Sequence, residues 1–295
     1  MNREQASASS SDYLKSLPLY PLPHHAISRL TYRLTRVEAA WFKNAFIKWF
    51  ADTYKVDWSE SLHQRPEDFI HFNAFFTREL RAGARPIEGD DATVVSPADG
   101  HISQIGHIDK DAVFQAKGHS FSVTELLGGN DERAAAFRNG RFATVYLSPR
   151  DYHRVHMPFG GRLRETVYIP GRLFSVAGHT VRTVPNLFAR NERLVAIFDT
   201  DAGPMALVLV GAINVAAIET VWSGLVTPPH RSGIEVNDLR GEHIELERGA
   251  EMGRFNMGST AIVLFGNNAV DWLDALQAEQ PLRMGQTLGK LSNPR

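Results

Sequence analysis

Residues 193–210 read RLVAIF, DTDAGP and MALVLV in succession, and this stretch decides the fold class. Aliphatic and β-branched residues fill the two outer runs, whereas the middle run holds the Asp, Gly and Pro that are typical of turns. Similar short runs recur at Thr93–Val95, Phe142–Leu147, Leu163–Ile169, Asn214–Val221 and Ala261–Phe265. Their β-branched content and turn spacing predict a β-rich body of mainly antiparallel strands.

Upstream of this body the apolar spacing becomes helical. Residues 26–54 predict a helix, with one apolar face formed by Trp41, Phe42, Ala45, Phe46, Trp49 and Phe50. Residues 66–80 predict a second helix, and shorter helices are expected at 123–127 and 269–278. The polar, serine-rich residues 1–12 predict a disordered tail, and Pro18, Pro21 and Pro23 predict an extended segment. The fold class is therefore α+β, with a small N-terminal helical region at 1–65 and a β-rich domain at 66–295.

Composition excludes several classes of protein. The 295 residues are 43% hydrophobic and 22% charged, which is ordinary for a globular protein. Cysteine is absent, so disulfides, iron–sulfur clusters, thiolate zinc sites and cysteine nucleophiles are excluded. A net charge of −1 gives no indication of nucleic acid as a partner. The N-terminus lacks a secretory signal, and the longest apolar stretch, 205–218, is too short to span a membrane, so a soluble or peripheral protein is expected.

The first 50 residues carry an excess of positive charge, with seven Lys or Arg and three Asp or Glu. Basic residues there include Arg33, Arg36, Lys43 and Lys48. A basic, aromatic-rich amphipathic helix can lie in a membrane interface. The commoner alternative is that the aromatic stripe packs on the core of the protein itself, and the residues alone favour that alternative.

Histidines and a carboxylate follow two of the expected strands. The segment 148–158 (SPRDYHRVHMP) holds His153 and His156, and 94–100 (VVSPADG) ends in a turn with Asp99. A metal site would need a third ligand, for which His179 or Asp99 is available, but no HExxH spacing is present. The plainer interpretation is two loop histidines and a carboxylate that caps a turn.

The segment 255–260 (FNMGST) places a serine at the entry to an expected strand. No Gly-x-Ser-x-Gly elbow is present. If Ser259 were a nucleophile, His156 could serve as its base and Asp99 as the group that orients the base. Sequence spacing does not establish that the three residues meet.

Several long motifs, in order, resemble the bacterial phosphatidylserine decarboxylases, a family of pyruvoyl-dependent enzymes. The motifs are FNAFFTRELRAGARPI (72–87), SPADG (96–100), FSVTELLGG (121–129), ATVYLSPRDYHRVHMP (143–158), LFARNERLVAIFDTDAGPMALVLVGA (187–212) and MGRFNMGSTAIVLF (252–265). One departure is Met257, where the family usually has leucine before Gly-Ser-Thr. Leucine and methionine have similar volumes, so the exchange should be tolerated.

The resemblance implies that the chain cuts itself between Gly258 and Ser259. A β chain of residues 1–258 and an α chain of residues 259–295 would result. Ser259 Oγ would attack the preceding carbonyl carbon, with His156 as the base and Asp99 as its orienting partner. The ester so formed would undergo β-elimination and leave a pyruvoyl group, made from Ser259, as the covalent cofactor. The resemblance implies no metal.

The resemblance further implies decarboxylation of phosphatidylserine to phosphatidylethanolamine through a Schiff base with the pyruvoyl group, with His153 as the proton donor. A lipid substrate implies a peripheral protein on the cytoplasmic face of the bacterial cell membrane. Contact with the anionic membrane surface is then expected through Trp41, Phe42, Phe46, Trp49 and Phe50. A homodimer is left open.

Three alternatives remain beside this interpretation. A serine hydrolase could use Asp99, His156 and Ser259 without cutting itself. A pyruvoyl decarboxylase for a soluble amino acid would need no interfacial helix. A non-catalytic carrier or scaffold is indicated faintly by Ala98-Asp99-Gly100 and by the segment 284–289, which resemble biotinyl-type and lipoyl-type barrels.

Overall fold

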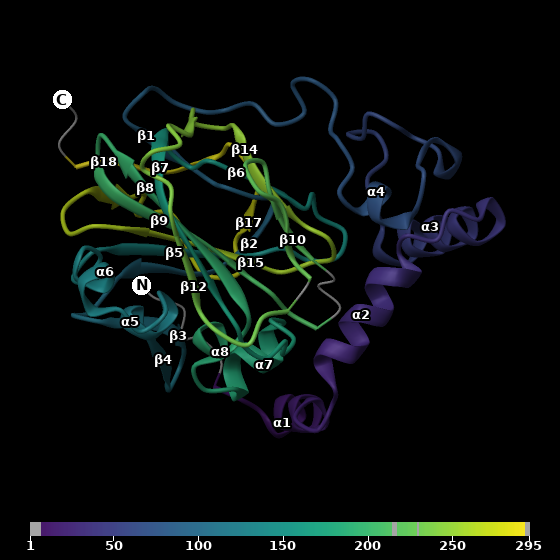
Figure 1. Ribbon diagram of the computed structural model, residues 1–295, viewed down its shortest axis with the longest axis horizontal. Helices are drawn as coiled ribbons and strands as arrows, with labels where there is room; N and C mark the ends of the chain where they lie inside the picture. The colour runs from purple at the N-terminus through teal and green to yellow at the C-terminus, as the bar shows by residue number, and fades with distance from the viewer. Residues whose placement is uncertain (1–6, 214–216, 229, 293–295) are drawn as a thin grey trace.

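The computed structural model describes residues 7–213, 217–228 and 230–292 (Figure 1). Its helices, including two 3-10 helices (η), are α1 (Ser10–Ser16), η1 (Leu17–Leu19), α2 (His24–Leu34), α3 (Ala40–Tyr54), η2 (Pro66–Asp68), α4 (Phe72–Phe76), α5 (Val123–Leu126), α6 (Asp131–Ala135), α7 (Gly178–Thr183) and α8 (Leu187–Arg190). The strands are β1 (Thr93–Val95), β2 (Gly100–His107), β3 (Ala112–Ala116), β4 (His119–Ser122), β5 (Arg141–Tyr146), β6 (Arg154–His156), β7 (Gly161–Ile169), β8 (Arg193–Thr200), β9 (Gly203–Val210), β10 (Ile218–Thr220), β11 (Gly224–Thr227), β12 (Glu235–Asp238), β13 (Glu245–Leu246), β14 (Glu251–Phe255), β15 (Thr260–Phe265), β16 (Val270–Trp272), β17 (Pro281–Leu282) and β18 (Thr287–Leu291). The expected α+β class, with helices first and a β-rich antiparallel body after them, is confirmed.

The largest sheet in the described residues runs β12-β7-β8-β9-β15-β5-β2-β17, with β13 also paired to β7. All strand pairs of this sheet are antiparallel in the described residues, and the two runs of residues 193–210 form the adjacent strands β8 and β9. Strand β15 lies between β9 and β5, and all six of its residues are buried. A central strand covered on both faces needs an unbroken apolar run, and TAIVLF supplies one from its second residue onward.

Smaller sheets flank this one, in the orders β1-β18-β16, β11-β10-β14-β6 and β3-β4. The sheet containing β14 and β6 is the one that matters for the site, because β14 leads directly into residues 256–259 and β6 carries His156. The pairing of β6 with β14 therefore brings segments about a hundred positions apart in the sequence side by side.

Helices α2 and α3 form an arm along one side of the β-rich body, and α4 lies beside α3 (Figure 1). A second core, separate from the main one, is formed there by Ile47, Phe50, Ala51, Val56, Phe69, Phe72, Phe75 and Phe76. Helix α4 is joined to the body by a buried hydrogen bond in which the side-chain amide of Asn73 donates to Oδ1 of Asn256, 2.6 Å away. None of the helices that the structure describes is both long and apolar enough to cross a membrane.

Two expectations for the N-terminal residues were wrong. Residues 10–16 form α1 rather than a disordered tail, and Pro18 lies in the 3-10 helix η1 rather than in an extended segment. Ser9 caps α1, and the carboxylate of Asp12 accepts two hydrogen bonds from Arg182 of α7. A tertiary ion pair therefore orders a segment whose composition alone predicted disorder; residues 1–6 lie outside the described residues.

Three expected helices also differ from the structure. The helix at 26–54 is divided into α2 and α3, because the carbonyl of Thr35 accepts from the amide of Asn73 instead of continuing the helix. The helix at 66–80 is reduced to η2 and α4, since residues 79–81 bond to residues 60–62. The segment 269–278 holds strand β16, paired with β18, and no helix. The helix expected at 123–127 is confirmed by α5, whereas 214–216 of an expected strand lie outside the described residues.

Candidate active site

Ser259 lies at the entrance to β15, directly before the first residue of this central strand. Its carbonyl accepts a hydrogen bond of 2.8 Å from the amide of Leu147, which extends the β5–β15 pairing by one step. The side chain is fully buried, and Oγ has no hydrogen-bond partner. A buried hydroxyl without a partner costs stability, about 1–3 kcal/mol, so Oγ of Ser259 does not stabilise the fold.

The backbone before Ser259 is strained and tightly packed. Met257 has φ of 101°, a region that residues other than glycine rarely adopt. A Cβ added to Gly258 would lie only 3.2 Å from Nε2 of His153 and 3.4 Å from the carbonyl oxygen of Leu147. A side chain at 258 would therefore crowd the histidine nitrogen that approaches the backbone there.

His153 is the histidine that the structure places beside the 258–259 peptide. Its Nδ1 lies 2.8 Å from the carbonyl of Asp151, which only accepts hydrogen bonds, so Nδ1 carries the proton. The other nitrogen, Nε2, is buried, unpartnered and directed at Gly258. Phe76 of α4 covers the ring at 4.0 Å between centroids. His153 thus presents a free lone pair to the peptide bond.

Burial, together with the positive charge of Arg78, lowers the pKa of His153 from 6.5 to about 3. The unfolded chain takes up a proton at this residue near pH 6.5, but the folded chain does not. We therefore expect the free energy of unfolding to decrease as the pH falls below about 6.5, by about 2 kcal/mol from this group at pH 5. Urea denaturation of the Ser259→Ala chain at pH 7 and pH 5 measures this loss.

The matched variant for this measurement is His153→Gln in the same Ser259→Ala chain. It lacks the titrating ring, so the loss between pH 7 and pH 5 should be smaller by about 2 kcal/mol. Other buried histidines lose stability in the same direction but are common to both chains. An equal loss in the two chains would contradict a neutral, buried His153.

His156 lies on β6, and the structure gives both of its ring nitrogens a partner. Nδ1 donates to the carbonyl of Gly249 at 2.8 Å, and the hydroxyl of Tyr152 donates to Nε2 at 3.0 Å. Burial is the main cause that lowers the pKa of His156 and raises that of Tyr152. His156 is therefore neutral and holds its lone pair in a hydrogen bond with Tyr152.

Asp99 lies in the turn before β2 and is held by an arginine. Nε and Nη2 of Arg85 donate to its two oxygens, and the amide of Met284 donates to Oδ1 at 2.8 Å. Nη2 of Arg85 also donates to Glu60 at 2.7 Å. The following Gly100 has φ of 150°, and a Cβ there would lie 2.0 Å from the carbonyl oxygen of Tyr146. Asp99 is thus more than a turn residue, because its side chain is fixed by an ion pair.

The structure brings some of the expected site residues together and keeps others apart. His153, Gly258 and Ser259 are neighbours. Among the described residues, His156 makes no hydrogen bond to Asp99 or Ser259, so no connected triad is formed. The alternative metal site is not formed either, since no three-ligand cluster in the described residues joins His153 and His156 to His179 or Asp99.

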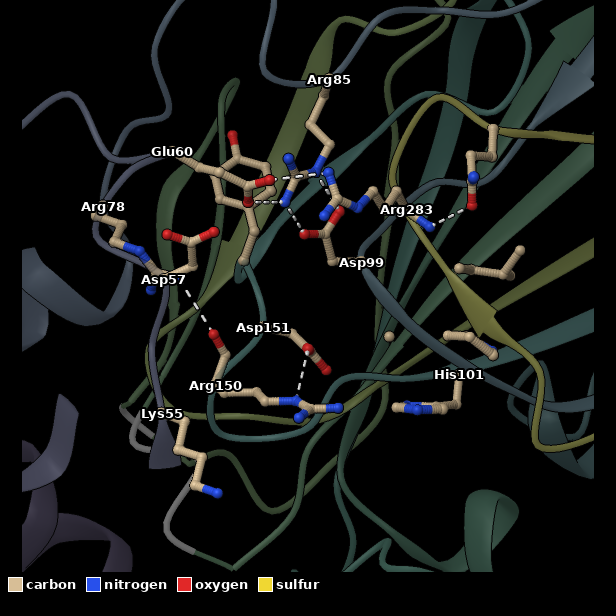
Figure 2. A pocket seen from close by; sticks show the side chains of 15 residues that line it. Lys55, Asp57, Glu60, Arg78, Arg85, Asp99, His101, Arg150, Asp151 and Arg283 are labelled. Carbon is tan, nitrogen blue, oxygen red and sulfur yellow. Dashed lines mark hydrogen bonds and ion pairs between the residues drawn. The ribbon is translucent and has the colours of Figure 1, made fainter. Parts of the chain in front are cut away.

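A charged cavity of about 400 Å³ opens beside Asp99 (Figure 2). Its cationic lining residues are Lys55, Arg78, Arg85, Arg150 and Arg283, and its acidic ones are Asp57, Glu60, Asp99 and Asp151. Arg85 is occupied by Asp99 and Glu60, as the dashed lines in Figure 2 show. Neither Ser259 nor His153 lines this cavity. A lining that is charged in both senses does not suit an apolar ligand.

The expected membrane contacts divide into two groups. Phe50 is buried among Phe72, Phe75 and Phe76, and Phe46 stacks on Phe72 at 4.2 Å between ring centroids. Phe42 is partly covered, whereas Trp41 and Trp49 are 80% and 57% exposed. One edge of the aromatic stripe is therefore core, so the expected membrane contact at Phe50 was wrong, and the other edge faces outward.

Three interactions at the site were not predicted from the sequence. Tyr152 occupies Nε2 of His156, Arg85 binds Asp99, and Arg78 lowers the pKa of His153. All three residues lie within the motifs that resemble the family, at 72–87 and 143–158, so the sequence marked them as candidates. Their roles depend on which side chains the fold places opposite them, and spacing does not contain that information.

Comparison with known proteins identifies the family. The model of the phosphatidylserine decarboxylase family matches residues 72–290, and a further family model, described as PSD, matches residues 14–55. The chain belongs to the phosphatidylserine decarboxylase family. It is 58% identical over 272 residues to a phosphatidylserine decarboxylase proenzyme of Pseudomonas fluorescens, covering 92% of this chain and 94% of that protein. A proenzyme of the same name from Alkalilimnicola ehrlichii is 59% identical, and the match covers 89% of this chain and 91% of that protein. Another from Stutzerimonas stutzeri is 56% identical, and the match covers 95% of each chain.

Membership of this family makes the chain an enzyme, a carboxy-lyase, and confirms the resemblance found in the motifs. Membership of this family also argues against the three alternative interpretations of the sequence. The hydrolase, the decarboxylase for a soluble amino acid and the scaffold each predict a different family. The word proenzyme in the names of the relatives describes a precursor, which agrees with a chain that is processed before it acts.

Proposed function

We propose that this chain decarboxylates phosphatidylserine to phosphatidylethanolamine with a pyruvoyl group made from its own Ser259. The observation that carries the proposal is the buried, unpartnered Oγ of Ser259, next to a strained Met257 and an unpartnered lone pair on Nε2 of His153. These features suit a peptide bond that is held ready to react.

The first step is self-cleavage. Oγ of Ser259 attacks the carbonyl carbon of Gly258, and the bond to the Ser259 nitrogen breaks to leave an ester and a free amine. β-Elimination then releases Gly258 as a carboxylate, and water replaces the nitrogen, which departs as ammonia. A ketone remains on residue 259, at the head of a central strand where solvent is excluded.

We assign His156 as the base that takes the hydroxyl proton and Asp99 as the group that orients it, following the family motifs. This assignment requires two exchanges at His156: Nε2 must accept from Ser259 instead of Tyr152, and Nδ1 must donate to Asp99 instead of Gly249. Asp99 would then face His156 while it remains bound to Arg85. The negative charge of Asp99 already raises the pKa of His156 slightly against the larger effect of burial.

His153 acts in the second reaction, and its protonation state defines how. The pyruvoyl ketone supplies an electron sink for the electron pair that is left when carbon dioxide departs. His153 starts neutral, so it cannot begin as a proton donor. Its Nε2 first accepts a proton from the ammonium group of the serine head group. The same proton then returns to the α-carbon after carbon dioxide has left.

The exposed edge of the N-terminal arm is our proposed membrane contact, at the cytoplasmic face of the bacterial cell membrane. Trp41, Trp49, Leu30 and Leu34 expose large apolar side chains there. Exposed basic residues on the same helices are Arg29, Arg33 and Lys48. A surface that is both apolar and basic suits a bilayer with anionic lipids.

We expect the Trp41→Ala/Trp49→Ala double variant to bind vesicles of phosphatidylserine and phosphatidylcholine at least ~10-fold more weakly, because two large apolar side chains leave the interface. Vesicle flotation measures binding, and self-cleavage should be unchanged. Phe114→Ala is the matched control, since it removes an exposed aromatic residue from β3 instead of from the arm. Equal flotation of the double variant and the control would contradict this contact.

The intact mass of the purified protein tests the proposed function directly. Cleavage at Gly258–Ser259 gives chains of 258 and 37 residues, with masses of about 29 and 4 kDa. Loss of ammonia makes the smaller chain about 17 Da lighter than a peptide that begins with serine. A single 32.9 kDa chain that stays intact during long incubation would contradict the proposal.

A further inference from the structure

A cluster of metal-ligating groups lies outside the site described above. His25 of α2, Glu192 directly before β8 and His230 after β11 each present one ligand atom, and these atoms lie within 4.8 Å of one another. The ring centroids of His25 and His230 are 4.5 Å apart, and the ring planes are tilted by 59°. Within the described ranges this is the one cluster of three such groups.

The backbone fixes His25 in the form that binds a metal. Its Nε2 lies 3.0 Å from the carbonyl of Gly171, which only accepts, so Nε2 carries the proton. Nδ1 is then a bare lone pair, and it is buried without a hydrogen-bond partner. A histidine that donates to a backbone carbonyl through one nitrogen and offers the other is the usual arrangement at metal centres. Burial also lowers the pKa of His25, which keeps the ring neutral.

Glu192 and His230 complete the donor set. Nδ1 of His230 lies 2.8 Å and 2.9 Å from the two carboxylate oxygens of Glu192, and the carboxylate is almost fully buried. The hydroxyl of Tyr168 donates to Oε1 of Glu192, and the amide of Arg231 donates to that hydroxyl at 3.1 Å. Outer hydrogen bonds of this kind orient ligating carboxylates. The carboxylate of Glu192 is thus oriented by hydrogen bonds from behind, whereas Nδ1 of His25 has no hydrogen-bond partner.

We propose that His25, Glu192 and His230 form a Zn²⁺ site. Two imidazole nitrogens and one carboxylate oxygen are ligands that Zn²⁺ takes, with water in the fourth position. The ion would take the lone pair of Nδ1 of His230, and the ring proton that Nδ1 now shares with Glu192 would move to Nε2 by exchange with solvent. No oxidation or reduction is involved.

The position of the site gives it a structural role. His25 belongs to the N-terminal arm, whereas Glu192 and His230 belong to the β-rich body, so the ion would join the two. The amide of Gly211 donates to the carbonyl of Glu192, and neighbouring Val210 pairs with Thr260. The site therefore lies at the same end of the sheet as Ser259, with β9 between them. It would hold α2 in place at that end of the sheet.

The test is titration of the untagged, EDTA-treated full chain with ZnCl2, followed by calorimetry and elemental analysis. We expect one Zn²⁺ per chain and a higher melting temperature with the ion. The variants are His25→Gln, whose amide can still donate to Gly171, and His230→Gln. Each should bind Zn²⁺ at least ~10-fold more weakly and lose the thermal shift, since loss of even an outer partner costs about 10–100-fold in affinity.

His179→Gln is the matched control, because it removes a histidine of α7 that is not in the cluster. It should bind Zn²⁺ as the unaltered chain does. Circular dichroism without metal establishes that each variant is folded, and either ligand variant suffices if the other fails to fold. No stoichiometric binding by the unaltered chain, or unchanged affinity in a folded ligand variant, would overturn the proposal. Neither readout depends on self-cleavage or decarboxylation, so failure here is distinct from failure of the proposed function.

Discussion

Replacing Ser259 by alanine should leave one intact chain without decarboxylase activity. The variant has no oxygen to attack the carbonyl of Gly258, so neither the cut nor the ketone can form. Activity should fall by at least ~10⁶-fold, because the rate enhancement of enzymes typically begins near that value. Intact mass and release of carbon dioxide from phosphatidylserine vesicles measure the two effects.

Stability distinguishes this result from misfolding. Oγ of Ser259 is buried without a partner, so its removal should leave the free energy of unfolding unchanged or slightly higher. The matched control is Ser28→Ala, which removes another buried, unpartnered serine hydroxyl, from α2. The Ser28 variant should be cut and active. Cleavage of the Ser259→Ala chain at the same bond would remove Ser259 from the mechanism.

The second large effect is that substitutions at two histidines should impair different reactions, with His156 needed for self-cleavage and His153 for decarboxylation. His156→Ala should stay uncut, because no base takes the proton of Ser259. His153→Ala should be cut, yet its turnover per cut chain should fall by about 10²–10⁴-fold, the usual contribution of a general acid or base. Intact mass gives the fraction cut, and release of carbon dioxide per cut chain gives the turnover.

The geometry makes this pair of variants decisive. Nε2 of His153 faces Gly258, whereas Nε2 of His156 is occupied by Tyr152. If His153→Ala remained uncut and His156→Ala were processed, the base would be His153, and the assignment from the family motifs would be wrong for self-cleavage. His119→Ala, on β4, controls for the loss of a histidine elsewhere in the chain.

The local sequence pattern was enough to predict much of the β-rich body. The runs at 194–198, 206–210 and 261–265 became β8, β9 and β15 because a buried strand needs a short, uninterrupted apolar run with turns at its ends. The helices were predicted less well where their ends depended on distant partners. The helix at 26–54 is interrupted by a hydrogen bond from Asn73, and residues 270–272 of the expected helix at 269–278 pair with β18. Such competition between local and distant hydrogen bonds cannot be seen in a window of sequence.

The sequence by itself determined the family, the antiparallel body and the identity of the residues at the Gly-Ser junction, because long motifs and apolar periodicity are properties of the linear chain. Only the tertiary structure decided that His153, not His156, lies against Gly258, that Arg85 holds Asp99, and that Phe50 is core while Trp49 is exposed. It alone brought His25, Glu192 and His230 together. The physical reason is that hydrogen bonds, ion pairs and burial depend on distances between side chains that are remote in sequence, and strand pairing sets those distances.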